Sequence, residues 1–198
     1  MPVSLTGRLL VASPALDEPT FHRTVILMLA HNEEGALGVV LNRPTPAPVA
    51  EMLPGWEALA AEPPMVFTGG PVAPASVICL GELAGGGAAA GGPGGPGAEP
   101  LVEPAVEPVV EGLTTVDLTQ PPSSVVPSVS RVRIFAGYSG WGADQLEGEL
   151  EEGSWIVVDR AAGDAMAPDA DAQWREVLRR AGGRAALYAR APDHLWLN

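Results

Sequence analysis

Two apolar segments separated by a five-residue polar loop constrain the fold of this chain more than any other feature. Residues 24–30 (TVILMLA) are apolar and largely β-branched or aliphatic, and residues 36–41 (ALGVVL) are similar. The loop between them, HNEEG, is short and ends in glycine, which is typical of a β-hairpin. Because the first segment has no polar face, we expect it to form a central strand that is buried on both sides.

Seven further apolar segments predict strands, and three segments predict helices. The strands are expected at residues 9–12, 65–68, 76–80, 113–118, 131–136, 155–158 and 185–189, and the helices at 49–53, 144–152 and 171–181. The last helix has apolar residues at helical spacing, with Asp169 or Asp171 available as its N-cap. Because strands and helices do not alternate regularly, the sequence predicts an α+β fold rather than a doubly wound α/β fold.

Residues 83–108 differ in composition from the rest of the chain. The segment consists mostly of Gly, Ala, Pro and Glu, and it has neither helical nor strand periodicity. Such a composition cannot bury enough apolar surface to offset the entropy lost on ordering. We therefore expect one domain over residues 1–198, interrupted by a flexible surface loop at 83–108.

Charge and cysteine content limit the classes of function. The 198 residues carry a formal net charge of −13, and all eleven basic residues are arginines. This charge argues against a nucleic-acid platform, because DNA-binding proteins usually carry a basic face. The single cysteine, Cys79, cannot form an internal disulfide, and no apolar run approaches the ~20 residues of a membrane helix. With no recognisable secretory signal, the sequence predicts a cytoplasmic protein without a membrane partner.

Two glycine-rich motifs mark candidate functional positions. Residues 137–142 (GYSGWG) follow a predicted strand and precede a predicted helix, which is the context of a nucleophile elbow. The elbow requires glycine two residues after Ser139, and Trp141 stands there instead, so a turn anchored by aromatic residues is the competing interpretation. Adjacent Gly69 and Gly70 can form either an anion-binding nest or a structural turn.

No metal or cofactor is predicted. The three histidines show no metal-ligand spacing to one another or to Cys79, and the glycine fingerprints of nucleotide-binding loops are missing. Arg43, which follows the second hairpin strand, can bind a carboxylate or phosphate, or pair with one of the 24 acidic residues.

Four segments together resemble the YqgE/AlgH family of bacterial proteins. They are residues 5–44, 66–72 (VFTGGPV), 133–150 (RIFAGYSGWGADQLEGEL) and 174–183 (WREVLRRAGG). The resemblance implies a strand-rich, bifurcated sheet that closes partly into a small barrel and is flanked by helices. It implies no settled activity, although one branch of the family carries the label of a transcriptional regulator. The family often has alanine where this chain has Ser139, which disfavours a catalytic serine.

The sequence leaves three functional hypotheses. The first is a regulatory protein that binds a small molecule or a protein partner, and the second is a hydrolase-like enzyme that uses the glycine–aromatic motif. The third is a transcriptional regulator, with direct DNA binding not expected because no helix-turn-helix with a basic recognition helix is apparent. The enzyme hypothesis requires a base such as His31 beside Ser139.

The first hypothesis predicts that eight residues from separate motifs converge on one concave ligand-binding patch. These residues are Arg23, His31, Asn42, Arg43, Gly69, Gly70, Tyr138 and Trp141. Neither the ligand nor the oligomeric state follows from the sequence.

Overall fold

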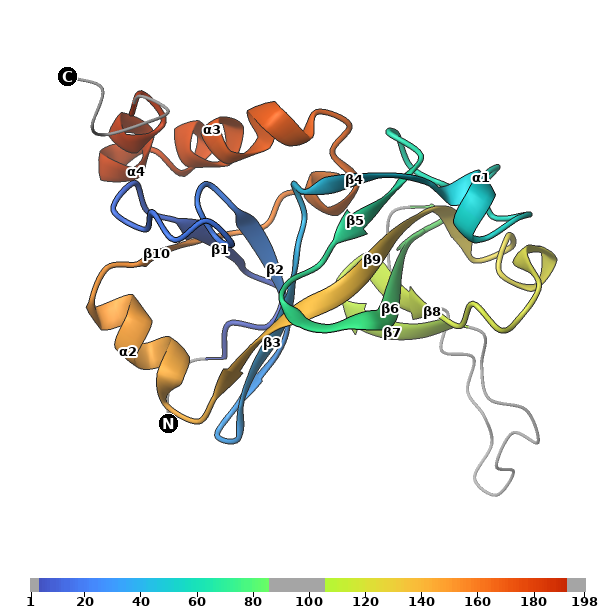
Figure 1. Cartoon of the computed structure of the whole chain (residues 1–198), viewed down its shortest axis with the longest axis horizontal. Coiled ribbons are helices and arrows are strands. Elements are labelled where there is room, and N and C mark those ends of the chain that lie inside the picture. Colours follow the sequence, from blue (N-terminus) through green and yellow to red (C-terminus); the bar gives the residue numbers. More distant parts are fainter. Residues whose placement is uncertain (1–3, 86–105, 192–198) are drawn as a thin grey trace.

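The computed structural model describes residues 4–85 and 106–191, and within them a ten-stranded sheet dominates the architecture (Figure 1). Hydrogen-bonded neighbours follow the order β10-β1-β2-β3-β9-β6-β8-β7, while β4 and β5 branch off at β9. The strands are β1 (Leu9–Ala12), β2 (Val25–Asn32), β3 (Gly35–Val40), β4 (Pro44–Pro48), β5 (Met65–Thr68), β6 (Val72–Leu83), β7 (Val106–Val110), β8 (Leu113–Val116), β9 (Val129–Gly142) and β10 (Trp155–Val158). The helices of the described chain are α1 (Val49–Met52), α2 (Gln145–Glu151), α3 (Ala170–Ala181) and α4 (Gly183–Tyr188). The predicted α+β class and bifurcated sheet are confirmed.

The sheet divides at β9, the longest of the described strands. Phe135 and Ala136 of β9 pair in parallel with Phe67 and Thr68 of β5. Further along the same edge, residues 139–142 pair antiparallel with residues 35–38 of β3. The opposite edge of β9 pairs with β6. One strand therefore exchanges its neighbour partway along its length, and this exchange produces the fork in the sheet.

Glycines allow two backbone segments to meet at this fork. A Cβ on Gly69 would lie 2.2 Å from the carbonyl oxygen of Gly137, and a Cβ on Gly70 would lie 2.3 Å from the backbone of Tyr138. Gly70 also has a φ of 152°, a conformation that residues with a side chain rarely adopt. Both glycines of the 69–70 pair are therefore required by the close approach of β9.

Alternating side chains of the strands β1, β2 and β3 bury both faces of this part of the sheet. Leu9 and Val11 point into a core cluster with Trp174 of α3, whereas Leu10 and Ala12 pack in a second cluster with Leu146 of α2. Figure 1 shows α3 and α2 on opposite sides of these strands. The prediction of a central strand buried on both faces is confirmed for the first half of β2, where residues 25–28 are fully buried.

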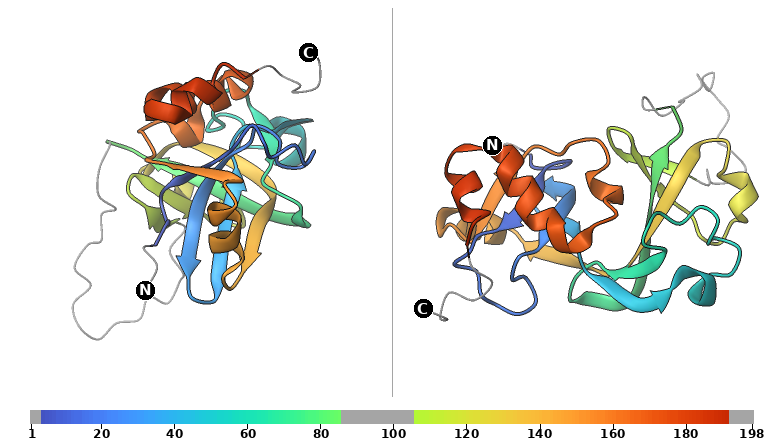
Figure 2. Two further views of the ribbon diagram at one scale, coloured as in Figure 1. Left: turned by 90° about the vertical axis from the view of Figure 1, so that its left-hand side faces the viewer. Right: turned by 90° about the horizontal axis from the view of Figure 1, so that it is seen from above.

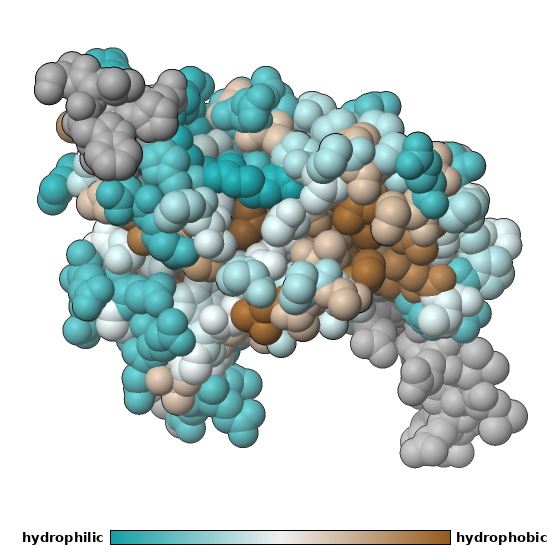
Figure 3. Space-filling view, viewed as in Figure 1, coloured by the Kyte–Doolittle hydropathy of each residue, from teal (hydrophilic) through white to brown (hydrophobic). Residues whose placement is uncertain are grey.

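A third apolar cluster lies in the other half of the sheet. It joins β6, β8 and β9 to α1 through residues that include Val49, Trp56 and Val132. Figure 3 shows hydrophobic residues gathered on the face between α1 and β6, and Val77 of β6 remains 52% exposed.

Three sequence predictions differ from the structure. Residues 185–189, predicted as a strand, lie mostly in α4, because Gly182 and Gly183 end α3 with positive φ values and a second short helix follows at once. The strand β4 was not predicted because it contains three prolines, which are tolerated on a strand that pairs only with β5. Within the predicted loop 83–108, Leu83 belongs to β6 and residues 106–108 to β7, while residues 86–105 lie outside the described residues.

We expect two glycine-to-alanine substitutions, one at the fork and one in α2, to have opposite effects on the free energy of unfolding. Gly70→Ala should lower the free energy of unfolding by about 2–5 kcal/mol, because the new methyl group meets the Tyr138 backbone at an unfavourable φ. Gly148→Ala, in α2 with open space around it, should instead raise this free energy by up to about 1 kcal/mol. Urea denaturation of both variants measures the difference. Equal stability of Gly70→Ala and the wild type would show that the fork tolerates a side chain.

Candidate functional site

The sheet is curled (Figure 2), and the loops after its two end strands, β10 and β7, line a common hollow. Arg160 follows β10 at one end of the sheet, and its Nη2 donates a hydrogen bond to the carbonyl oxygen of Glu111, which follows β7 at the other end. Gly7, just before β1, lies beside Val110 of β7, since a Cβ on Gly7 would be 3.5 Å from the Val110 side chain. The seam between these two ends is therefore lined on one side by residues next to β1 and β10, and on the other side by residues of β7 and the turn after it.

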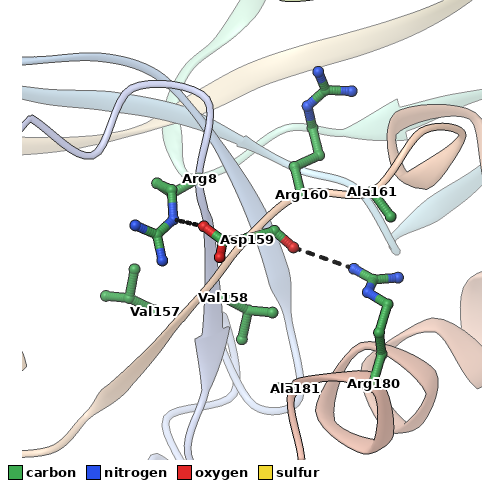
Figure 4. Close-up of a pocket in the computed structure, with 8 residues that line it drawn as sticks. All are labelled: Arg8, Val157, Val158, Asp159, Arg160, Ala161, Arg180 and Ala181. Carbon is green, nitrogen blue, oxygen red and sulfur yellow. Dashed lines mark hydrogen bonds and ion pairs between the residues drawn. The ribbon is translucent and has the colours of Figure 1, made fainter.

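Three adjoining hollows follow this seam, and we call them together the seam groove. The first hollow, of about 410 Å³, lies between Arg8, the end of β10 and the end of α3 (Figure 4). The second, of about 320 Å³, shares Arg8, Asp159 and Arg160 with the first and extends to residues 109–111. The third, of about 470 Å³, lies between Arg160, Glu82 and residues 111–113. Arg160 contributes to the wall of all three.

Three of the eleven arginines line the groove, and their charges are compensated unequally. Arg180 forms a two-pronged ion pair with Asp164, with nitrogen–oxygen distances of 2.9 and 2.7 Å. The Nε of Arg8 lies 2.7 Å from Oδ1 of Asp159. Arg160 forms no ion pair with any of the described residues. It is therefore the least neutralised cation of the groove.

Two guanidinium N–H groups in the groove make no hydrogen bond to any of the described residues. They are the Nε groups of Arg8 and Arg160, and both nitrogen atoms are shielded from solvent. The nearby carboxylate of Asp159 is close to Arg8 but outside the direction of a hydrogen bond. An unsatisfied buried donor costs about 1–3 kcal/mol, so an acceptor oxygen that entered the groove would be stabilised there.

The residues predicted from the sequence fall into three groups, and the first surrounds the start of β2. The side chain of Asn42 accepts from the Val25 N–H and donates to the Arg23 carbonyl oxygen, both at 2.9 Å. Arg43 donates to the carbonyl oxygens of His22 and Asn42. Desolvation by burial lowers the pKa of Arg43. These polar groups thus hold the backbone turn that leads into β2.

Arg23 connects the same turn to α3. Its guanidinium carbon lies 4.7 Å from the centre of the Trp174 ring, a cation–π distance. Its Nη2 donates to the carbonyl oxygen of Ala191 at 2.9 Å. Arg23, Asn42 and Arg43 are therefore brought together, as the shared-patch hypothesis requires of them.

The second group, Gly69, Gly70 and Tyr138, lies at the fork. Tyr138 pairs with Val72 of β6, and its side chain packs against the core cluster that contains Trp174. The two glycines are buried against β9. Their N–H and carbonyl groups take part in strand contacts, such as the 2.8 Å bond from Gly69 N–H to the Ala136 oxygen.

The third group, His31 and Trp141, lies beside α2. Nδ1 of His31 accepts from the Leu5 N–H at 3.1 Å, and Nε2 contacts Oε1 of Glu147 at 2.9 Å. The indole N–H of Trp141 donates to Oε2 of Glu149 at 2.9 Å. Both side chains therefore attach the sheet to this helix.

The structure does not gather the eight residues into one patch. At about 3.3 Å per residue, Val25, which Asn42 holds, is about 20 Å along β2 from His31. Ser139 and His31 are also apart, because Ser139 pairs with Gly38 of β3. Gly38 in turn pairs with Met28 of β2, which is three positions and about 10 Å from His31 along that strand. The Ser139 hydroxyl is fully buried and donates to the Gly69 oxygen at 3.2 Å. The geometry therefore gives no serine–histidine pair.

Sequence reasoning missed the seam groove. Its one local signal was the charged pair Asp159–Arg160 directly after a predicted strand. The partners of this pair lie far away in the chain, at residues 8 and 111, and only the curl of the sheet brings them together.

The described residues show neither a metal-binding cluster, nor a membrane-spanning helix, nor a reactive thiol. Residues 4–85 and 106–191 contain no group of three or more His, Cys, Asp or Glu side chains that could hold a metal ion. Their helices are also too short or too polar to cross a membrane. Burial raises the pKa of the Cys79 thiol to about 12, so this group stays protonated and unreactive at neutral pH.

Glu149 is expected to anchor α2, because its carboxylate accepts from the indole N–H groups of both Trp141 and Trp155, at 2.9 and 2.7 Å. Glu149→Ala leaves both donors without this acceptor and should lower the free energy of unfolding by about 2–4 kcal/mol. Glu151→Ala, on the exposed side of the same helix, should change it by less than about 0.5 kcal/mol. Chemical denaturation followed by tryptophan fluorescence compares them, and equal effects of the two substitutions would contradict the anchoring role.

Comparisons with known proteins agree with this architecture. A family model described as AlgH-like matches residues 9–186. UPF0301 proteins of Streptomyces avermitilis and Streptomyces coelicolor are 48% and 50% identical over 195 residues, which cover 98% of this chain and 96% of each relative.

Two solved structures share the fold. The crystal structure of a Corynebacterium diphtheriae protein has a TM-score of 0.81 at 29% identity, covering 96% of this chain and 94% of that one. The solution structure of the AlgH protein from Pseudomonas aeruginosa has a TM-score of 0.63 at 24% identity, covering 97% of both chains. By its match to the family model and its identity to these relatives, the chain belongs to the AlgH-like, or UPF0301, family.

Proposed function

We propose that this protein is a regulatory binding protein whose ligand is an anionic small molecule held in the seam groove by Arg8 and Arg160. One observation carries the proposal: both arginines line the same 320 Å³ hollow, and each has a solvent-shielded Nε–H that makes no hydrogen bond to the described residues, the Nε of Arg8 being in charge contact with Asp159 alone. Guanidinium groups recognise phosphate and carboxylate oxygens through such N–H groups.

The charge of the whole chain makes this local arrangement informative. A net charge of −13 repels anions at long range, so an anion binds only where specific donors outweigh that field. Arg180 is held by the buried carboxylate of Asp164, whereas Arg8 contacts only the exposed carboxylate of Asp159 and Arg160 has no ion pair among the described residues, so Arg8 and Arg160 are the cations of the groove that can take a ligand. The buried, unpaired Cys79 is in keeping with action in the cytoplasm, which is part of the proposal.

A second location for the ligand is the cluster of Arg23, Asn42 and Arg43. These residues lie together, but the groups described above already bond to backbone carbonyl and N–H groups. A ligand there would have to replace internal hydrogen bonds, whereas a ligand in the seam groove would give acceptors to two Nε–H groups that make no hydrogen bond and would displace only the exposed carboxylate of Asp159. The seam groove is therefore favoured.

The proposal predicts thermal stabilisation by anions that depends on Arg160. At a hundred times its dissociation constant, a ligand adds about 2.7 kcal/mol, or roughly 5–10 °C in unfolding midpoint for a chain of this length. We expect a shift of this size for at least one member of a panel of inorganic phosphate, sugar phosphates, nucleotides and organic acids. Arg160→Ala should abolish it.

Arg43→Ala serves as the matched control, because it removes an arginine from the alternative cluster and should leave the shift in place. A shift that survives Arg160→Ala and disappears in Arg43→Ala would move the site to that cluster. If no anion of the panel shifts the midpoint of the wild type, the ligand is not an anionic small molecule.

A further inference from the structure

We infer that Asp159 is an internal competitor for the ligand of the seam groove, and that the two positive charges of Arg8 and Arg160 make the groove select a dianionic phosphate monoester over a monoanion. This inference rests on the proposed function and adds the class of ligand and the means of selection. It comes from the position of one carboxylate within the groove.

Asp159 already pairs with Arg8, the cation that a ligand would contact. Its Oδ1 is 2.7 Å from the Nε of Arg8, and its backbone oxygen accepts from Nη2 of Arg180 at 3.5 Å. Figure 4 shows the carboxylate against the guanidinium of Arg8, while the side chain of Arg160 points away from this pair. Both arginines line the first and the second hollow, and in either one a ligand that contacts both must displace Asp159 from Arg8.

A ligand oxygen can readily replace the carboxylate of Asp159 beside Arg8. The side chain of Asp159 is 86% exposed, and exposed ion pairs contribute little to stability. The Nε–H of Arg8 is not directed at the carboxylate in hydrogen-bond geometry. An incoming oxygen with better geometry can thus replace Asp159 without disturbing the fold.

The charge of the ligand decides whether this exchange is favourable. A monoanion offers Arg8 the same charge that Asp159 already supplies, so little is gained. A phosphate monoester carries a charge between about −1.5 and −2 at neutral pH and has three acceptor oxygens, enough for the Nε–H of Arg8 and that of Arg160. The two positive charges of the groove then attract it more strongly than they attract a monoanion.

Methyl phosphate and methyl sulfate test the selection, because they have similar shapes and differ by about one charge at pH 7.5. Isothermal titration of the wild type should give an affinity for methyl phosphate at least about tenfold higher than for methyl sulfate. Asp159→Asn should raise the affinity for both anions by about tenfold, since Arg8 is then free. Glu111→Gln removes another carboxylate beside the same hollow and should raise it by less than about threefold.

A double-mutant cycle separates competition for Arg8 from a general effect of charge. In an Arg8→Met background, which removes the guanidinium that Asp159 and the ligand would share, Asp159→Asn should change the affinity by less than about threefold. A tenfold gain in both backgrounds, or equal affinity of the wild type for the two probes, would overturn the inference while leaving an anion site in place. If neither probe binds the wild type or Asp159→Asn, the anion site itself is refuted.

Discussion

The close contact between the backbone at Gly69–Gly70 and the backbone at Gly137–Tyr138 is the constraint on which the rest of the structure depends. It lets β9 pair with β5 and β6 near Phe135 and with β3 a few residues later. Without this contact the two halves of the sheet, with their separate apolar clusters, would not share a strand. The glycine-rich motifs thus have a backbone role at the fork, where a side chain would collide with neighbouring main-chain atoms.

The position of the seam groove also depends on this fork, because the fork gives the sheet its curl. Because the sheet branches and bends at β9, its first strands and its last strands return toward each other, and Arg160 bridges the remaining seam to Glu111. Sites at the mouths of closed or nearly closed sheets are common because loops from several strands meet there. Here the meeting loops supply arginines in a strongly acidic chain, and two of their Nε–H groups make no hydrogen bond in the described part of it.

Local sequence patterns predict several strands and the long helix α3, but they do not predict the site. Residues 9–12, 65–68 and 155–158 could be assigned from apolar runs, and α3 from its spacing and its cap, where Asp169 accepts from the Ala172 N–H at 2.9 Å. Local patterns gave the wrong prediction at two elements. The prolines of β4 hid a strand, and the apolar residues of α4 were predicted as a strand. The seam groove could not be predicted because Arg8, Glu111 and Arg160 are joined only by tertiary closure.

The most direct test of the account is a map of where phosphate binds on the folded protein. Titration of isotope-labelled protein with inorganic phosphate, followed through backbone amide resonances, gives this map in one experiment. The account predicts that the largest shifts fall on residues 6–8, 109–111 and 159–160, which line the second hollow. Shifts centred on residues 23 and 42–43, or none at all at concentrations of tens of millimolar, would contradict it.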